Sequence, residues 1–419
     1  MEMILFMTAL FVEIFFVVWA FVTGKKHQKE KEIVRIIALV LLITLVLLGV
    51  LHGFIRYGVF IFVLALQVLI GGICIIRKRD KPLRKGKSVV VSIGALLLYL
   101  LSLTPVFLFP EFTDLKVTGS HQVVMKEYTW IDEGRVETYT DTGEDRELTV
   151  KFFYPTEEGV YPLVVFSHGA FGVIDSNYST CMNLASNGYV VASIGHTYQA
   201  MYLKNVNGKS YMASMDFINS VMAENGTRDP KGEETIYRNS RVWMDIRCKD
   251  ENFVLNTILN KVAAGEEGPF QLINPEKIGL FGHSMGGATS VQMGRERDDI
   301  DAVINLECTM YGEYVDFVNG AEVFNDEPYT VPILDVNSGD IDRQARELSG
   351  QEYVNFYVGE RATDYHYQVV EGAGHLNFTD LPMFSPILAK MLGTGNIDAK
   401  ECIVNMNQMI LDFFNHYLK

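Results

Sequence analysis

The sequence predicts an α/β protein, with a mostly parallel β-sheet flanked by helices, that follows four transmembrane helices. Three observations support this fold class. Four long apolar runs lie within residues 1–110. After residue 147, short strand-like runs alternate with helix-like stretches, as they do in βαβ units. A Gly-x-Ser-x-Gly motif lies directly between a predicted strand and a predicted helix.

Charge divides the 419-residue chain into two unlike parts. Residues 1–110 contain 13 Lys or Arg and 5 Asp or Glu, whereas residues 111–419 contain 23 and 46 of these types. We therefore predict a membrane domain over residues 1–110 and one large domain over residues 111–419. The net charge of −15 argues against nucleic-acid binding. Five cysteines without a Cys-x-x-Cys pair argue against a disulfide scaffold and a common zinc site.

The apolar runs cover residues 3–22, 36–54, 59–76 and 88–109. Each is close to the ~20 residues that a helix needs to cross the hydrocarbon core of a bilayer. The first run lacks the basic start and the small-residue cleavage site of a signal peptide, so we expect it to remain as a span.

Basic residues between the runs predict the orientation of the spans. Five Lys or Arg lie between the first two runs and seven between the last two, whereas the middle gap holds only Arg56. Short basic loops stay in the cytoplasm, so the domain at residues 111–419 is expected to be extracytoplasmic. This domain would be tethered at a plasma membrane, close to membrane lipids. The arrangement of apolar runs and basic loops suggests a bacterial plasma membrane.

The strands and helices of the large domain follow from short apolar runs and helical periodicity. The continuous apolar runs are typical of buried parallel strands. The polar stretch at residues 197–235 interrupts the alternation and is a candidate lid. Strands are predicted at residues 147–154, 162–166, 189–194, 277–281, 301–306, 331–336 and 365–370, and helices at 178–187, 239–262, from 285 onward and at 401–417.

Gly282-His283-Ser284-Met285-Gly286 follows the predicted strand at residues 277–281 and precedes a helix. This is the context of a nucleophile elbow, in which small residues allow a tight turn that exposes the serine hydroxyl. The motif therefore predicts an α/β-hydrolase fold with Ser284 as the nucleophile. A serine hydroxyl is a weak nucleophile by itself and needs a general base.

His375 is the expected base, because it lies in a glycine-rich loop after the last predicted strand. His168 and His283 lie inside glycine motifs and are expected to shape turns, while His196 ends a strand and could line the pocket. The oxyanion hole needs two backbone N–H groups, for which Met285 and Ala170 are the candidates. The acid stays open between Glu307, which follows one strand, and Asp340, which follows the next, with Asp335 and Asp342 nearby.

Several segments together resemble the platelet-activating factor acetylhydrolase family, in its plasma and intracellular type II forms. The resemblance covers about residues 120–417 and leaves out the apolar runs. It implies Ser284, His375 and Glu307 as the triad, although the family has aspartate at the position of Glu307. It also implies hydrolysis of short-chain or lipid esters. The matching segments are ELTVKFFYP, PLVVFSHGAFG, YRNSRVWMDI, KIGLFGHSMGGAT, INLE, PILDVNS and GHLNFTD.

The function expected from these observations is that of a membrane-anchored serine ester hydrolase that works through an acyl-enzyme. Its partners would be an ester or phospholipid substrate and membrane lipids. No cofactor or metal is implied, and the sequence leaves the oligomeric state open. A broader α/β-hydrolase (polyester hydrolase, lipase, amidase or peptidase) remains an alternative, as does a membrane protein that only binds a ligand.

Overall fold

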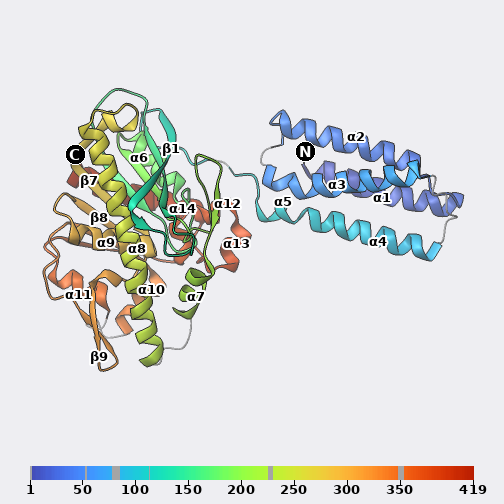
Figure 1. Cartoon of the computed structure of the whole chain (residues 1–419). Helices are drawn as coiled ribbons and strands as arrows, with labels where there is room; N and C mark the ends of the chain where they lie inside the picture. The colour runs from blue at the N-terminus through green and yellow to red at the C-terminus, as the bar shows by residue number, and fades with distance from the viewer. Residues whose placement is uncertain (1, 52–53, 78–84, 113, 225–229, 348–352) are drawn as a thin grey trace. The chain divides into compact units, whose positions relative to one another are not determined.

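The structure is a computed structural model that describes residues 2–51, 54–77, 85–112, 114–224, 230–347 and 353–419. The chain divides into two compact units. Unit 1 comprises residues 1–113 with Phe384–Ile387, and unit 2 comprises the remainder. Figure 1 labels the α-helices and several of the strands of the two units.

Unit 1 consists of helices. Two stretches are long and apolar enough to cross a membrane by length and composition, Arg56–Ile76 and Val89–Leu108, while Met7–Thr23 is a shorter apolar helix. Among the described residues, two of the four predicted spans thus meet this criterion, the third and the fourth. The helices are α1 (Glu2–Thr23), α2 (Gln28–Leu47), α3 (Phe54–Ile76), α4 (Lys85–Ser102) and α5 (Thr104–Leu108).

Helix α2 begins eight residues earlier than the second apolar run, so part of the predicted basic loop is helical. Lys31 and Arg35 therefore lie on α2, where both contact Glu13 of α1. Lys31 Nζ lies 2.5 Å from Glu13 Oε2, and Arg35 Nε donates to Glu13 Oε1 at 2.8 Å. Glu13 is only 3% exposed. The second basic gap falls mostly on residues 78–84, outside the described residues.

Unit 2 is built on an eight-stranded sheet with the order β1-β2-β4-β3-β7-β8-β11-β12. The strands from β4 to β12 pair in parallel, whereas β2 is antiparallel to both β1 and β4. The mostly parallel sheet predicted from the sequence is confirmed. Its strands are β1 (Val123–Val136), β2 (Asp145–Pro155), β3 (Tyr161–Ser167), β4 (Val190–Gly195), β7 (Ile273–His283), β8 (Ala302–Leu306), β11 (Ile333–Ser338) and β12 (Tyr365–Val370).

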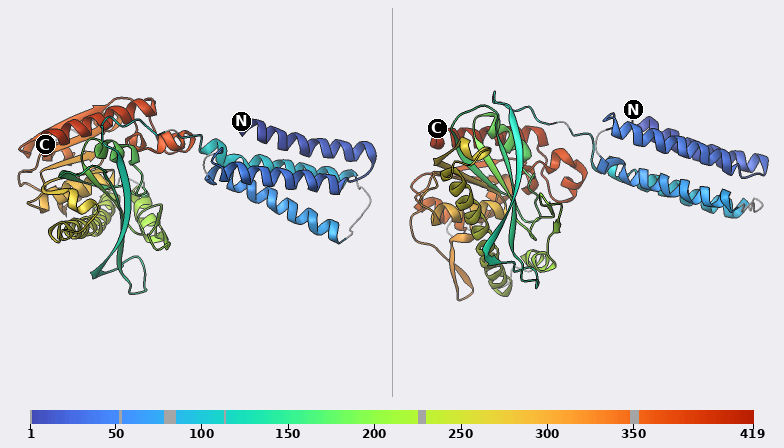
Figure 2. Two further views of the ribbon diagram at one scale, coloured as in Figure 1. Left: turned by 90° about the horizontal axis from the view of Figure 1, so that it is seen from above. Right: turned by 45° about the horizontal axis from the view of Figure 1, so that its top comes forward.

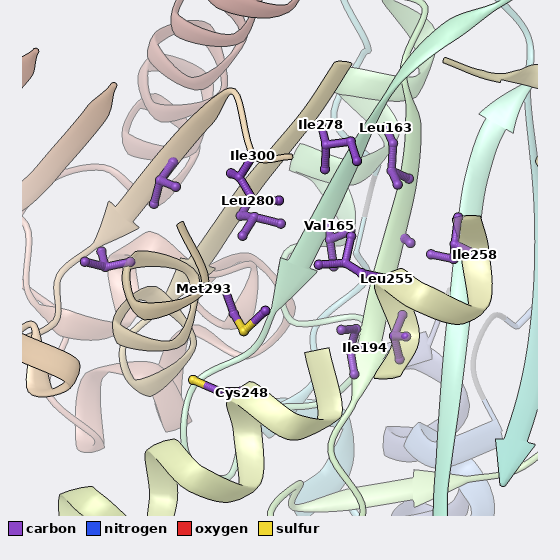
Figure 3. Packing of buried hydrophobic residues seen from close by; sticks show 14 of the residues in the cluster. Leu163, Val165, Ile194, Cys248, Leu255, Ile258, Ile278, Leu280, Met293 and Ile300 are labelled. Carbon is purple, nitrogen blue, oxygen red and sulfur yellow. The ribbon is translucent and has the colours of Figure 1, made fainter. Parts of the chain in front are cut away.

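Helices cover both faces of this sheet, because alternate side chains of the strands are apolar on each face. One buried cluster joins Val165 and Leu280 to Leu255 of α8, and Figure 3 shows strand side chains pointing toward that helix. The other joins Phe166 and Phe281 to α6 and α14. The helices of this unit are α6 (Tyr178–Ser186), α7 (Met215–Glu224), α8 (Pro230–Ala263), α9 (Met285–Glu296), α10 (Gly339–Glu347), α11 (Val354–Arg361) and α14 (Ala399–Leu418), with short 3-10 turns η1 (Pro269–Leu272), η2 (Tyr311–Glu313) and η3 (His375–Phe378). Two short helices, α12 (Leu381–Phe384) and α13 (Pro386–Met391), are divided between the two units.

Strand β1 was not predicted, because its charged and half-exposed residues give little apolar alternation. It is the long teal strand at the edge of the sheet in both views of Figure 2. The candidate lid contains the small hairpin of β5 (Tyr202–Lys204) and β6 (Ser210–Met212), followed by α7. A second small hairpin is formed by β9 (Tyr314–Val318) and β10 (Ala321–Phe324). All five cysteines are free.

Candidate active site

The segment between β7 and α9 turns sharply at Ser284. This residue has φ 53° and ψ −134°, which an L-residue rarely adopts, and its N–H donates to the Leu306 carbonyl at 2.8 Å. The flanking glycines allow the turn. A Cβ at Gly282 would lie 2.1 Å from the Gly286 carbonyl carbon, and one at Gly286 would lie 1.9 Å from the Ser167 oxygen. The local geometry is that of a strand–turn–helix nucleophile elbow.

The loop after β3 packs directly against this turn. A Cβ at Gly169 would lie 2.9 Å from Ser284 Cβ, so glycine is needed for the close approach. The next residue in the loop is Ala170, and the residue after the serine is Met285. Among the described residues, neither of their backbone N–H groups donates a hydrogen bond. An oxyanion hole requires two such available N–H groups beside the nucleophile.

His375 is held beside the elbow by its own glycine-rich loop. Asn377 Oδ1 accepts from the Gly374 N–H at 2.9 Å and fixes the start of η3. His283 Nε2 lies 2.9 Å from the His375 carbonyl oxygen, and the centroids of the two rings are 4.6 Å apart. His283 therefore links the elbow to the His375 loop. Within the described part of the chain, the Ser284 hydroxyl itself makes no hydrogen bond.

The electrostatic surroundings of His375 favour its neutral form. Desolvation by nearby protein atoms lowers the pKa of His375 to about 4, even though 44% of its side chain is exposed. The imidazole is therefore unprotonated at neutral pH. An unprotonated ring can accept a proton, which a general base must do.

Among the described residues, Glu307 is the carboxylate nearest to His375. Its Oε1 lies 4.0 Å from His375 Nδ1, which is longer than a hydrogen bond. The carboxylate is instead held by Ser338, whose Oγ donates to Oε1 at 2.7 Å and whose N–H donates to Oε2 at 3.1 Å. Burial raises the pKa of Glu307 to about 7.

The other aspartates considered for the acid lie in different surroundings. The Asp340 side chain is 72% exposed in the first turn of α10, and its Oδ1 is 2.5 Å from Arg343 Nη2. Asp335 is fully buried and accepts hydrogen bonds from Asn305, Asn355 and Tyr365. Asp342 pairs with Arg346. Glu307 is thus the member of this group that the fold brings to His375.

A second Ser–His–Asp set, which the sequence did not reveal, lies behind the loop. Ser167 Oγ is 2.8 Å from His196 Nε2, and His196 Nδ1 is 2.9 Å from Asp250 Oδ2. All three residues are completely buried, so His196 does not line a pocket. Burial lowers the pKa of His196 to about 4 and keeps it neutral. The set joins β3, the residue that follows β4, and α8 inside the protein.

Arg247 of α8 is a further buried residue that sequence reasoning missed. It donates to the backbone oxygens of His168 and Gly169 and, at 2.7 Å, to Gln199 Oε1. His168 was expected to shape its turn, and its Nδ1 does lie 2.7 Å from the Gly169 oxygen. The loop that carries Ala170 is therefore fixed from the inside of the protein.

Comparison with known proteins places unit 2 in a family. The family model described as "Platelet-activating factor acetylhydrolase, isoform II" matches residues 136–419. A platelet-activating factor acetylhydrolase of Gallus gallus is 26% identical over 291 residues, with 64% of each chain covered. One of Cavia porcellus is 26% identical over 295 residues, with 65% of this chain and 61% of that protein covered. The chain thus spans less than two thirds of the length of these curated relatives.

A solved structure agrees with the fold. A ferulic acid esterase from Streptomyces cinnamoneus matches with a TM-score of 0.53 and 21% identity, over 72% of this chain and 92% of that one. At this identity the match shows the fold alone. The resemblance inferred from the sequence motifs is confirmed, because the family model covers more than half of the chain. The chain belongs to the family of platelet-activating factor acetylhydrolase, isoform II.

Proposed function

We propose that this chain is a membrane-anchored serine ester hydrolase with Ser284 as its nucleophile. The observation that carries the proposal is the strained turn at Ser284, which lies beside two backbone N–H groups that donate no hydrogen bond among the described residues. A turn that serves only to connect β7 to α9 would not need backbone strain at this position. Membership of the family supports carboxylic esters as the substrate class.

In the proposed reaction, Ser284 Oγ attacks the ester carbonyl while His375 takes its proton. The carbonyl oxygen becomes an oxyanion and accepts hydrogen bonds from the N–H groups of Ala170 and Met285. His375 then gives its proton to the departing alcohol, which leaves an acyl group on Ser284. In the second half of the reaction, His375 takes a proton from water, which attacks the carbonyl of the acyl-enzyme. The proton then passes from His375 to Ser284 Oγ, and the carboxylic acid product is released. Glu307 orients the imidazole and stabilises its positive charge, after an approach of about 1 Å that brings the pair within hydrogen-bonding distance.

The distribution of polarity in unit 1 supports a membrane location. Large apolar side chains face outward, including Phe11 at 70% exposure and Leu101 at 70%, whereas the charged Glu13 and Glu32 are buried. A soluble bundle shows the opposite arrangement, with its apolar side chains inside. Lipid tails are the natural environment for such a surface, and intramembrane charges are expected to pair with one another, as Glu13 and Arg35 do. We infer four spans, with α1 and α2 completing the bundle.

Topology can be tested on intact cells. The remaining basic residues of the first gap, including Lys25 and Lys26, support a cytoplasmic location for that gap and an extracytoplasmic location for unit 2. Protease added to spheroplasts should digest unit 2, and the chain should resist extraction by alkaline carbonate. Digestion of unit 2 only after the cells are lysed would place it in the cytoplasm and contradict the orientation.

The candidate lid supports a preference for small acyl groups. Phe217 of α7 is completely buried, and its ring centroid lies 5.3 Å from that of Phe171, which lies in the loop that carries Ala170. The same apolar cluster contains Met285 and Ala288 of α9. Side chains thus already fill the space next to the proposed oxyanion hole. A long acyl chain would have to displace them.

A substrate panel tests both the activity and this preference. We expect the full chain, in detergent or vesicles, to hydrolyse p-nitrophenyl acetate and phospholipids with a short sn-2 acyl chain faster than palmitoyl esters. The measured quantity is kcat/KM for each chain length. Peptide or amide hydrolysis at a higher kcat/KM than any ester would contradict the proposed substrate class.

A further inference from the structure

Arg247 holds a positive charge inside unit 2 without a direct ionic partner. It is completely buried, and among the described residues no Asp or Glu forms an ion pair with it. Burial lowers the pKa of Arg247 to about 10, which still leaves the guanidinium charged at neutral pH. A buried cation of this kind is costly, and the nearby Asp250 carboxylate offsets part of that cost.

The hydrogen bonds of Arg247 show which groups its guanidinium contacts. Its Nη1 donates to the His168 oxygen, its Nη2 lies 3.4 Å from the Gly169 oxygen, and its Nε donates to Gln199 Oε1. Two of its three acceptors are thus successive carbonyls of the loop that carries Ala170. Gln199 also holds this loop, because its backbone oxygen accepts from the Phe171 N–H at 3.1 Å.

Peptide geometry connects these carbonyls to the proposed oxyanion hole. In a trans peptide the C=O and the N–H point in opposite directions. The Gly169 oxygen faces Arg247 Nη2, His168 Nδ1 and the Gly172 N–H, which donates to it at 3.0 Å, so the Ala170 N–H of the same peptide points away from these groups. Gly169 itself packs against Ser284, so the peptide that carries this N–H lies beside the nucleophile.

We propose that Arg247 is a positioning residue of the oxyanion hole, which fixes and polarises the Gly169–Ala170 peptide so that Ala170 N–H binds the developing oxyanion. This inference rests on the proposed function and deepens it. Hydrogen bonds in series strengthen one another in a low-dielectric interior, so a cation at the carbonyl end makes the N–H a stronger donor. Its effect should appear in the transition state more than in substrate binding.

Arg247→Met tests the proposal, because it removes the charge and keeps an unbranched apolar stem. We expect kcat to fall by about 10²-fold with KM changed less than about threefold, as for loss of an oxyanion-hole donor. Rates are expressed per active serine titrated with a fluorophosphonate, so that a misfolded fraction does not count. A trifluoromethyl ketone, which forms an oxyanion on the serine, should lose affinity by a similar factor.

Arg295→Met is the matched control. Arg295 also lies in unit 2 and forms a partly buried ion pair with Glu313 at 2.7 Å, at the far end of α9 from Ser284. This variant should lower thermal stability and leave kcat per titrated serine unchanged. Equal loss of kcat in the two arginine variants would assign Arg247 a general structural role and overturn the proposal.

Gln199→Glu provides a test that does not depend on folding of the Arg247 variant. The new carboxylate would pair with the buried guanidinium, so stability should rise while kcat falls by about tenfold as the charge is neutralised. Unchanged kcat per titrated serine in Gln199→Glu or in folded Arg247→Met would refute the role of Arg247. A wild-type chain without esterase activity or serine labelling would instead refute the proposed function.

Discussion

Ser284→Ala should reduce ester hydrolysis by about 10⁴–10⁶-fold in kcat, the loss typical of a missing triad nucleophile. The hydroxyl is the atom that forms the acyl-enzyme, and no neighbouring group can replace it in the turn between β7 and α9. Removing one oxygen from a half-buried residue leaves the packing of the elbow intact. The variant should therefore fold normally, and the loss should appear with p-nitrophenyl acetate in a purified, detergent-solubilised preparation.

Ser167→Ala is the appropriate control for this variant. Ser167 belongs to the other Ser–His–Asp set and makes a 2.8 Å hydrogen bond to His196. It is completely buried, so it cannot meet a substrate. Its loss should change stability more than turnover. A collapse of activity in Ser167→Ala with retention of activity in Ser284→Ala would mean that the nucleophile has been misassigned.

The second large effect concerns the acid of the triad. Glu307→Gln should lower kcat by up to ~10⁴-fold, because the amide cannot stabilise the imidazolium that forms on His375. Asp340→Asn should have little effect, since Asp340 is exposed and its pair with Arg343 is a surface ion pair. Kinetic constants of both purified variants decide between them. A larger loss of kcat in Asp340→Asn than in Glu307→Gln would identify Asp340, which follows β11, as the acid.

The pH dependence of the same variants provides an independent check. Burial raises the pKa of Glu307 to about 7, so the carboxylate takes up a proton as the pH falls through this value. Wild-type kcat/KM should fall with it, because an uncharged Glu307 no longer supports His375. In Glu307→Gln the side chain at position 307 no longer titrates, while the pKa of His375 is lowered by burial to about 4, so the acid limb of the residual activity should move toward lower pH. Identical limbs in both proteins would exclude Glu307 from the mechanism.

The sequence predicted the parts of the fold that depend on local pattern. The runs that became β3, β4, β7 and β8 are short and apolar because both faces of the sheet are covered, and the Gly-x-Ser-x-Gly motif fixes the turn after β7 by local sterics. The glycines that follow the last predicted strand likewise indicated the loop that carries His375. These signals act over a few residues, so they can be seen without coordinates.

The parts that escaped prediction depend on distant contacts. Arg247 meets the His168 oxygen across 79 positions of sequence, and Asp250 meets His196 across 54, so no spacing rule connects them. The start of α2 was placed too late because charged residues were assigned to a loop, whereas their pairing with Glu13 allows them to lie on the helix. Glu307 was a candidate because of its place after β8, and the family resemblance favoured it, but the sequence did not reveal its hydrogen bonds to Ser338.

Mapping of a covalent probe tests the central claim most directly. The full-length chain is treated with a fluorophosphonate, digested, and examined by mass spectrometry. The mechanism predicts one equivalent of label per chain, on the peptide that contains Ser284, with loss of esterase activity in proportion to labelling. Label on another residue, or full activity after stoichiometric labelling of Ser284, would contradict it.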